Sequence, residues 1–428
     1  KCTVYAKVEF FNPAGSIKDR VAKQIIEDYE AESKIREGGT IIEGTSGNTG
    51  AGLALMAADR GYKSIFVMPD KQSEEKRAAL RAWGSKVVIT PTDVAADDPR
   101  SYYKVSERLV EETDNSCYAN QYHNPSNPKA HYLSTGPELW DQLDGKLDVF
   151  IAGVGTGGTI AGTGKYLKEQ NPDVQVVGVD PVGSLYYDYF YSNVQTKPYT
   201  YILEGIGEDF MPSTMDFRFV DDVIRVHDKE CFTMTRRLVR EEGIFAGASC
   251  GAAVAGALKY LRKHDREGMV AVIVLPDSGR NYLSKLFNDN WMEENRFFEP
   301  DKHSGTVASI LKRKKKRPLV TLQADTKVEK AIELLKKQGI SQVPVMDKEQ
   351  LIGVLTENQL LHRALRGGTS ETIHDLADLD FCVVHEDTEI EVLKELFSRF
   401  KIALVFEDRN KVSDIITRID LIDYIAKK

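Results

Sequence analysis

The chain has 428 residues with a formal net charge of −8 at pH 7, and 42% of the residues are hydrophobic. This hydrophobic fraction suffices for a buried core and excludes disorder throughout, and the length predicts two or three domains. The acidic balance argues against nucleic acid or an anionic membrane surface as a partner, and no window of 18 uncharged apolar residues predicts a membrane-spanning helix.

Strand and helix patterns alternate through the first part of the chain. Apolar runs and apolar–polar alternation predict strands over residues 4–10, 40–43, 64–68, 86–90, 148–152, 174–179 and 270–275. Helical spacing predicts a helix from Ser16 onward and helices over residues 51–60, 73–83 and 159–169. Strands separated by such helices form βαβ units, so we predict an α/β fold with mostly parallel sheets, whose ligands bind at the carboxyl ends of the strands.

The C-terminal part contains a weak internal repeat. Its units open at Asp325 and Asp387, and each continues with an amphipathic helix and a strand pair that ends in a threonine, Thr356 or Thr417. Two β-α-β-β-α units of about 60 residues predict an α+β module with pseudo-twofold symmetry. Residues 299–305, which contain Pro, Gly and charged residues, predict a linker before this module.

The first candidate for chemistry is Lys18, in the segment NPAGSIKDR of residues 12–20. Ser16 is a good N-cap and places Lys18 in the first helical turn. A cation there opposes the helix dipole, which favours the neutral amine that a Schiff base requires. On this segment alone, a solvated surface lysine is the alternative.

Two loops that join a strand to a helix offer binding sites for anions. Loop 44–50 (GTSGNTG) places three hydroxyls and the Asn48 amide where they can hold a carboxylate, although an ordinary polar turn is the alternative. Loop 153–159 (GVGTGGT) is typical of a phosphate-binding loop. It also matches G-x-G-x-x-G, and Asp180 ends the next strand, so a nicotinamide-dinucleotide enzyme is an equal alternative at this loop.

A third loop, residues 247–251 (GASCG), precedes a helix rich in small residues. Ser249 is either a plain N-cap or a hydrogen-bond partner for a buried ring nitrogen, and Cys250 is expected to be a small buried residue rather than a nucleophile. The eight histidines form no H-x-x-H pattern, so we expect no metal site. The five cysteines are too few and too scattered for a disulfide framework. We therefore expect reduced cysteines and a cytoplasmic protein.

Together, these segments resemble the fold-type II pyridoxal-phosphate (PLP) enzymes of the β family, and among them the cystathionine β-synthase family. The resemblance covers nearly the whole chain. It implies a PLP-dependent catalytic core over residues 1–298, a linker over 299–305 and a tandem CBS (Bateman) module over 306–428. The chain begins without methionine and enters a strand pattern almost at once, so we expect its true N-terminal start to be missing.

The resemblance also implies roles for individual residues. Lys18 would form the Schiff base with the cofactor, Asn48 would hydrogen-bond the cofactor's 3′-oxygen, and Ser249 would face the pyridine nitrogen. The phosphate loop would comprise Gly155, Thr156, Gly157, Gly158 and Thr159. The substrate site would comprise Thr45, Ser46, Thr49, Gln121, Glu204 and Gly205. A dinucleotide enzyme would use one loop and leave Lys18, Asn48 and Ser249 without roles, so we prefer the PLP interpretation.

The implied activity is a β-replacement that joins L-serine and L-homocysteine to give cystathionine, a step of transsulfuration, with hydrogen sulfide production from cysteine as a side activity. Cysteine synthase, which uses O-acetylserine and sulfide, is the alternative. The implied assembly is a homodimer or larger homo-oligomer. Ala14 departs from the family, which usually has glycine there, and Glu208 stands where animal relatives have an aromatic residue.

From a different class of function, the C-terminal module is a candidate adenine-nucleotide sensor. Thr417 and Asp420 fit the Thr-x-x-Asp ribose-binding pattern of such modules, whereas the first repeat has Gln359 in place of the carboxylate. We therefore expect at most one adenosyl ligand for each chain, and a purely structural module is the alternative.

Overall fold

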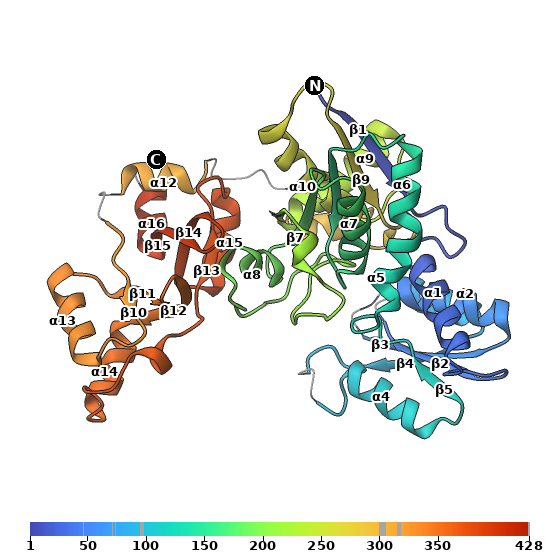
Figure 1. Ribbon diagram of the computed structural model, residues 1–428, viewed down its shortest axis with the longest axis horizontal. Coiled ribbons are helices and arrows are strands. Elements are labelled where there is room, and N and C mark those ends of the chain that lie inside the picture. Colours follow the sequence, from blue (N-terminus) through green and yellow to red (C-terminus); the bar gives the residue numbers. More distant parts are fainter. Residues whose placement is uncertain are drawn as a thin grey trace. The chain divides into compact units, whose positions relative to one another are not determined.

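The computed structural model shows a chain that divides by its internal contacts into two units (Figure 1). Its described residues are 1–45, 47–70, 72, 74–94, 98–298, 305–314 and 318–426. The first unit contains Lys1–Pro181 and Tyr201–Glu299, and the second contains Val182–Thr200 and Pro300–Lys428. None of the helices in the described ranges has the length and apolar character needed to cross a membrane.

The first unit contains two parallel sheets, which confirms the predicted α/β class. The larger sheet has the order β1 (Thr3–Val8), β9 (Val270–Leu275), β6 (Val149–Gly153), β7 (Gln175–Pro181) and β8 (Asp222–Val226). The smaller sheet has the order β4 (Lys86–Thr90), β3 (Lys63–Pro69), β2 (Thr40–Gly44) and β5 (Ser116–Tyr118). Strands β9 and β6 at the centre of the larger sheet are apolar runs because parallel sheets are covered on both faces.

Four helices carry the candidate loops; the first three each follow a strand, and the fourth follows helix α9 (Asp228–Glu242). They are α1 (Lys18–Ala31), α2 (Asn48–Arg60), α7 (Gly158–Gln170) and α10 (Ala248–His264). The first begins at Lys18 with Ile17 at the cap position, so the helix starts later than the predicted Ser16 cap. The Ser16 hydroxyl still accepts a hydrogen bond from the Lys18 N–H, at 3.2 Å.

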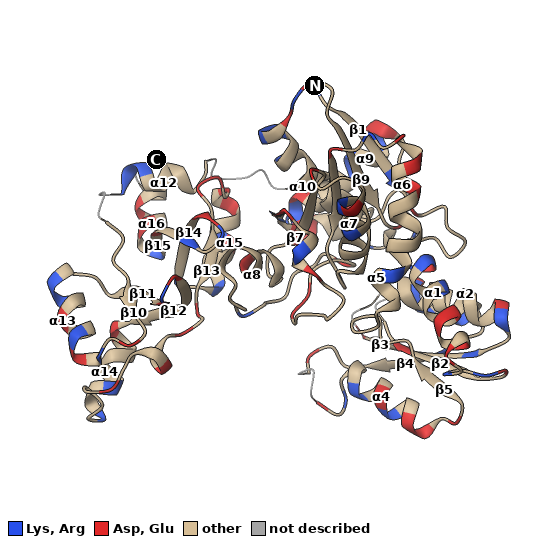
Figure 2. Ribbon diagram, viewed as in Figure 1, with Lys and Arg blue, Asp and Glu red and all other residues tan. Residues whose placement is uncertain are grey.

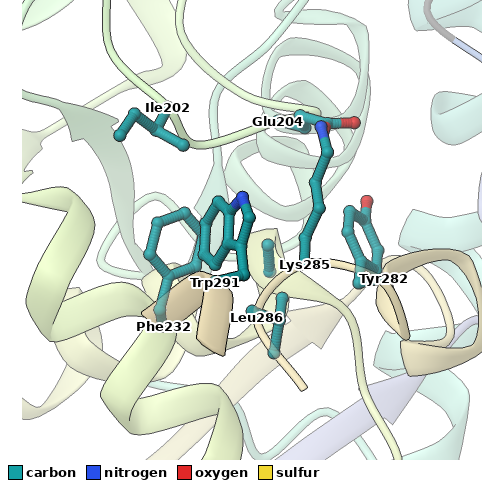
Figure 3. A pocket seen from close by; sticks show the side chains of 8 residues that line it. Ile202, Glu204, Phe232, Tyr282, Lys285, Leu286 and Trp291 are labelled. Carbon is teal, nitrogen blue, oxygen red and sulfur yellow. The ribbon is translucent and has the colours of Figure 1, made fainter. Parts of the chain in front are cut away.

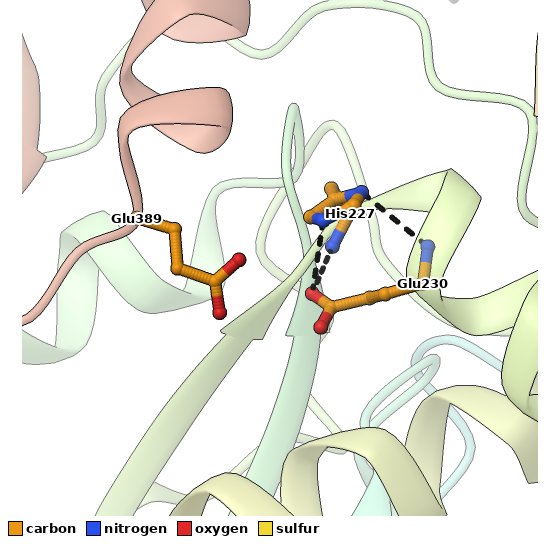
Figure 4. A group of neighbouring side chains, drawn as sticks. All are labelled: His227, Glu230 and Glu389. Carbon is orange, nitrogen blue, oxygen red and sulfur yellow. Dashed lines mark hydrogen bonds and ion pairs between the residues drawn. The ribbon is translucent and has the colours of Figure 1, made fainter. Parts of the chain in front are cut away.

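Further helices complete the first unit: α3 (Glu74–Ala82), α4 (Tyr102–Glu112), α5 (Ser126–Ala130), the π-helical turn His131–Thr135, α6 (Gly136–Gln142), α9 (Asp228–Glu242) and α11 (Asp289–Glu294). A capping box at the start of α9 joins His227 and Glu230: each side chain accepts the other residue's backbone N–H (Figure 4). Helix α10 packs closely on α9 because its glycines leave room. A Cβ at Gly251 would lie 2.0 Å from the Thr235 hydroxyl oxygen.

The second unit contains the predicted repeat. Its first half runs β10 (Leu322–Gln323), α13 (Val328–Gln338), β11 (Gln342–Asp347), β12 (Gln350–Thr356) and α14 (Glu357–Leu365). Its second half runs β13 (Cys382–Val384), α15 (Ile390–Arg399), β14 (Ile402–Asp408), β15 (Lys411–Thr417) and α16 (Arg418–Ala426). In each half the first strand pair is parallel and the second antiparallel, which confirms two β-α-β-β-α units. Helix α12 (Val307–Arg313) precedes them.

Segment Val182–Thr200, which carries α8 (Tyr186–Ser192), belongs to the second unit although sequence places it inside the first. Val182 is 1% exposed within the hydrophobic core of the second repeat. The Arg409 side chain donates to the backbone oxygen of Phe190 at 3.0 Å and lies over its ring at 4.1 Å. The domain boundaries 1–298, 299–305 and 306–428 stay a prediction. The contacts of Val182–Thr200 group this segment with the C-terminal part as well.

Charged residues of both signs are interspersed along the helices. Figure 2 shows Lys and Arg beside Asp and Glu on α4 and on α13. These two helices therefore present mixed charge, and neither forms the one-signed basic face that binding to a polyanion requires.

Candidate active site

Lys18 stands at the N-terminal end of α1, directly after the loop that leaves β1. The backbone N–H of Ile17 donates to the Pro276 oxygen at 2.9 Å, which fixes this turn against the end of β9. Burial lowers the pKa of the half-buried Lys18 ammonium, although the carboxylates of Glu208 and Asp277 oppose the shift. The structure therefore favours the neutral amine at Lys18, as a Schiff-base lysine requires.

Asn48 is the first residue of α2, and its side chain is fixed at both ends. Its Nδ2 donates to Asp277 Oδ2 at 2.8 Å, and its Oδ1 accepts from Asn281 Nδ2 at 3.3 Å. Asp277 is 1% exposed and follows β9. The sequence analysis did not identify Asp277. It could have been noticed because Pro276-Asp277 directly follows an apolar strand, and ligands of parallel sheets bind where the strands end.

The structure brings the predicted carboxylate site together from two segments. The Thr49 hydroxyl donates to Gln121 Oε1 at 2.6 Å across 72 residues of sequence, and both residues are buried. The Thr45 hydroxyl oxygen accepts the backbone N–H groups of Gly47 and Gly50 and shapes the loop before α2. The Gln121 side chain also hydrogen-bonds Glu43, so the amide is held between Thr49 and Glu43. Its NH₂ group has two hydrogens, and the one not given to Glu43 can be donated to a ligand. Ser46 lies outside the described residues.

A buried carboxyl group supports Gln121 from behind. Glu43, on β2, is 0% exposed and accepts the backbone N–H of Asn120 at 2.7 Å and that of Gln121 at 3.3 Å. Burial raises the pKa of Glu43 to about 8, although these hydrogen bonds oppose the shift. Sequence reasoning missed this residue because a glutamate inside a short strand gives no signal of a distant partner.

The glycine-rich loop between β6 and α7 has the geometry of an anion-binding site. Gly157 has φ +83°, and a Cβ there would lie 2.6 Å from Met215. A Cβ at Gly158 would lie 2.0 Å from Asn127 Oδ1, a buried atom that has no hydrogen-bond partner among the described residues. The backbone therefore stays bare at the N-terminus of a 13-residue helix, where its N–H groups and dipole favour an anion.

Buried side chains hold the two threonine hydroxyls of this loop. Asn127 Nδ2 donates to the Thr156 hydroxyl oxygen at 2.9 Å. His131 Nε2 lies 3.2 Å from the Thr159 hydroxyl oxygen, and its Nδ1 lies 2.9 Å from that of Thr135. Burial is the main cause that lowers the pKa of His131 well below its ordinary value, and the charge of Arg20 lowers it further, so this imidazole is neutral. Asn127 and His131 thus restrain the hydroxyl groups of Thr156 and Thr159 in this loop.

Ser249 is the second residue of α10, and Gly247 occupies the cap position, so Ser249 is not the plain N-cap of the alternative interpretation. It is 3% exposed. A Cβ at Gly205 would lie 3.6 Å from the Ser249 hydroxyl, and a Cβ at Gly155 would lie 3.0 Å from the Gly205 oxygen. Gly205 thus lies close to both the phosphate loop and Ser249. Cys250 is fully buried, as expected, and burial raises the pKa of its thiol well above the ordinary value.

Glu204 forms ion pairs with Lys76 and Lys285. Burial alone would raise the pKa of Glu204, but the two ammonium groups outweigh it and hold the pKa below its usual range. Figure 3 shows Glu204 and Lys285 in a pocket lined also by Ile202, Phe232, Ala248, Tyr282, Leu286 and Trp291. The sequence analysis named Glu204 and missed both lysines. Neither the sequence around Lys76 in α3 nor that around Lys285 indicates that the two side chains meet at Glu204.

These residues fit PLP as a bound group. A lysine of lowered pKa, a bare anion-binding loop at a helix N-terminus, and an uncharged serine beside that loop are the parts that a PLP enzyme needs. Asp180, which a nicotinamide enzyme would use for the ribose, is 0% exposed in β7. Fold and site together define a PLP-dependent enzyme of the α/β class.

Comparison with known proteins gives the family. A model of the pyridoxal-phosphate-dependent enzymes matches residues 1–277, and a model of the CBS domain matches residues 307–366 and 373–427. Cystathionine β-synthase of Dictyostelium discoideum is 39% identical over 446 residues, which cover 100% of this chain and 88% of that protein. Cystathionine β-synthase of Saccharomyces cerevisiae is 35% identical over 473 residues, which cover 100% of this chain and 93% of that protein.

Other relatives match about two thirds of the chain. Cysteine synthase of Staphylococcus aureus is 43% identical over 282 residues, covering 66% of this chain and 87% of that protein. The crystal structure of a hydrogen sulfide-producing enzyme from Fusobacterium nucleatum has a TM-score of 0.61 and 37% identity, covering 65% of this chain and 91% of that one. The chain belongs to the cystathionine β-synthase family, and it is a lyase whose cofactor is pyridoxal 5′-phosphate.

Proposed function

We propose that the enzyme condenses L-serine with L-homocysteine to give cystathionine and water. The observation that carries this proposal is the trio of Lys76, Glu204 and Lys285, of which Lys76 is buried and the other two are partly buried. A thiol amino acid brings a carboxylate and an ammonium group, and both need charged partners in a buried site. Sulfide brings neither group, so a trio of this kind favours an amino acid as the second substrate.

The proposed mechanism assigns each side chain a task. PLP supplies an electron sink for the α-carbon of the first substrate. Thr45, Thr49 and the Gln121 amide bind the substrate carboxylate, with Ser46 as a further proposed contact, and this binding orients the α-carbon toward Lys18. The neutral amine of Lys18 takes the α-proton and delivers a proton to the departing hydroxyl.

The remaining loops hold the cofactor. The phosphate is proposed to bind Gly155, Thr156, Gly157, Gly158 and Thr159. Asn48 would donate to the 3′-oxygen of the bound cofactor, and Ser249 would face its ring nitrogen. Because Ser249 is uncharged, it does not keep that nitrogen protonated, which suits elimination of the hydroxyl group. The site therefore has a basic amine, Lys18, to move protons and no charged side chain at the ring nitrogen.

The second candidate is cysteine synthase, which the 43% identity to the Staphylococcus aureus enzyme favours. A crossed steady-state assay of the holoenzyme tests the choice, with serine or O-acetylserine as donor and homocysteine or sulfide as acceptor. The proposal predicts the highest kcat/KM for serine with homocysteine. A clear preference for O-acetylserine with sulfide would replace it with cysteine synthase.

We also propose one adenosyl ligand for each chain at Thr417 and Asp420. Asp420 Oδ2 accepts the Thr417 N–H and hydroxyl, both at 2.8 Å, and Gln359 Oε1 makes the same two contacts with Thr356, at 2.6 and 2.7 Å. The two caps thus match in geometry and differ in charge. Only the second offers a carboxylate for ribose hydroxyls.

A cytoplasmic location and a homodimer or larger homo-oligomer complete the proposal. None of the five cysteines, all of which lie in the described ranges, forms a disulfide, and four are buried, which supports a reducing compartment.

A further inference from the structure

We propose that Asp277 is a positioning residue that fixes the orientation of the Asn48 amide toward the cofactor's 3′-oxygen. The inference rests on the proposed role of Asn48 and holds whichever substrates the enzyme uses. Asp277 influences Lys18 by its charge and hydrogen-bonds Asn48 directly, so its action on the cofactor's 3′-oxygen is exerted through Asn48.

The Asp277 carboxylate lies inside the protein among donors. It is 1% exposed, and its Oδ2 accepts from Asn48 Nδ2 at 2.8 Å and from the Tyr282 hydroxyl at 2.7 Å. A Cβ at Gly247 would lie 2.0 Å from its Oδ1, so the glycine leaves the room that the carboxylate fills. Burial raises the pKa of Asp277, and hydrogen bonds from Asn48 and Tyr282 oppose the shift.

The hydrogen bonds of Asn48 leave only one orientation for its amide. An ionised carboxylate accepts hydrogen bonds and donates none, so the nitrogen of the amide must face Asp277. The Asn48 oxygen is held by Asn281 Nδ2 at 3.3 Å, which agrees with this assignment. One Nδ2 hydrogen is used by Asp277, and the second remains for an acceptor such as the 3′-oxygen. With the amide reversed, the Asn48 oxygen would face the Asp277 carboxylate and the 3′-oxygen, and both of these acceptors would repel it.

The backbone of Asp277 joins two further segments of the site. Its oxygen accepts the Gly247 N–H at 3.0 Å, just before Ser249, and its backbone pairs with Ser16 as an isolated bridge, just before Lys18. These contacts use backbone atoms only. Substitution of the side chain therefore preserves these backbone contacts. It also changes the hydrogen bond from Tyr282 and the charge near Lys18, so a double-mutant cycle with Asn48→Ala is needed to isolate the effect on Asn48.

Asp277→Asn tests the inference because the amide has the same shape and gains a donor, so it no longer dictates the orientation of Asn48. We expect PLP to bind the apoenzyme about tenfold or more weakly, measured by fluorescence titration, and the absorbance maximum of the bound cofactor to shift. Asp188→Asn is the matched control, since Asp188 is also buried and accepts a hydrogen bond from Thr196 at 2.7 Å, within the second unit. It should leave PLP affinity unchanged.

A double-mutant cycle separates positioning from general support. If Asp277 acts through Asn48, Asp277→Asn should add little to the loss of PLP affinity in Asn48→Ala. Additive losses, or wild-type affinity and spectrum in Asp277→Asn, would overturn the inference. Should Asp277→Asn fail to fold, Asn281→Ala takes its place: a several-fold loss of PLP affinity that vanishes in the Asn48→Ala background supports the inference, and no loss overturns it. None of these readouts depends on cystathionine formation.

Discussion

Replacing Lys285 by glutamine tests whether the trio of charged residues selects an amino acid as the second substrate. The Lys285 ammonium pairs with Glu204, and the side chain is 25% exposed. A charge-assisted hydrogen bond contributes about 1.5–3 kcal/mol, and partial exposure favours the lower end of that range. Since about 1.4 kcal/mol corresponds to a factor of ten, we expect KM for homocysteine to rise about tenfold.

The assay compares two acceptors with serine as the fixed donor. Because Lys285 is expected to bind the second substrate equally in its ground and transition states, kcat with homocysteine should change little. KM for sulfide should not change, since sulfide has no carboxylate. Lys259→Gln is the matched control: Lys259 pairs with Glu230 at 2.6 Å, is 22% exposed, and lies outside the proposed site. An unchanged KM for homocysteine, or an equal rise for sulfide, would refute the reasoning.

Three further substitutions test other parts of the site. Ser249→Asp should lower kcat at least tenfold by giving the ring nitrogen a charged partner, whereas Cys250→Ala should be nearly neutral; the reverse pattern in steady-state kinetics would contradict the role of Ser249. Glu43→Gln should remove a pH dependence of stability. The raised pKa of Glu43 means that the folded state binds more protons between about pH 4.5 and 8, so wild-type stability falls as pH rises through this window. Denaturant unfolding at several pH values checks this, and identical slopes in both proteins would be the opposing result. Asp420→Ala should weaken an adenosyl ligand about tenfold or more in calorimetry with S-adenosylmethionine, AMP and ATP. No binding by the wild type would make the module structural, and two sites for each chain would show that Gln359 was misinterpreted.

Local patterns predicted much of the fold. The bounds of β4 and β9 agree with prediction, because β4 is an apolar run with a polar residue at each end and β9 is an apolar run that stops before Pro276. Lys18 lies in the first turn of its helix as predicted, although the cap position is Ile17. The repeat in the C-terminal part was visible because equivalent threonines end equivalent strands.

Contacts across long stretches of sequence were beyond this reasoning. Asn48 and Asp277 are 229 residues apart, and no local pattern announces that one will orient the other. Lys76 and Lys285 resemble ordinary surface lysines in sequence, yet both pair with Glu204. The same holds for segment Val182–Thr200, whose contacts place it with the second unit.

The most direct test of the central claim is to detect cystathionine by mass spectrometry after incubating PLP-loaded enzyme with serine and homocysteine, using wild type and Lys18→Ala. Circular dichroism must show that both proteins are folded. The account predicts cystathionine from the wild type and none above background from the variant, which should also lack the visible absorbance of a covalently bound cofactor. Substantial cystathionine from Lys18→Ala, or none from the wild type, would contradict it.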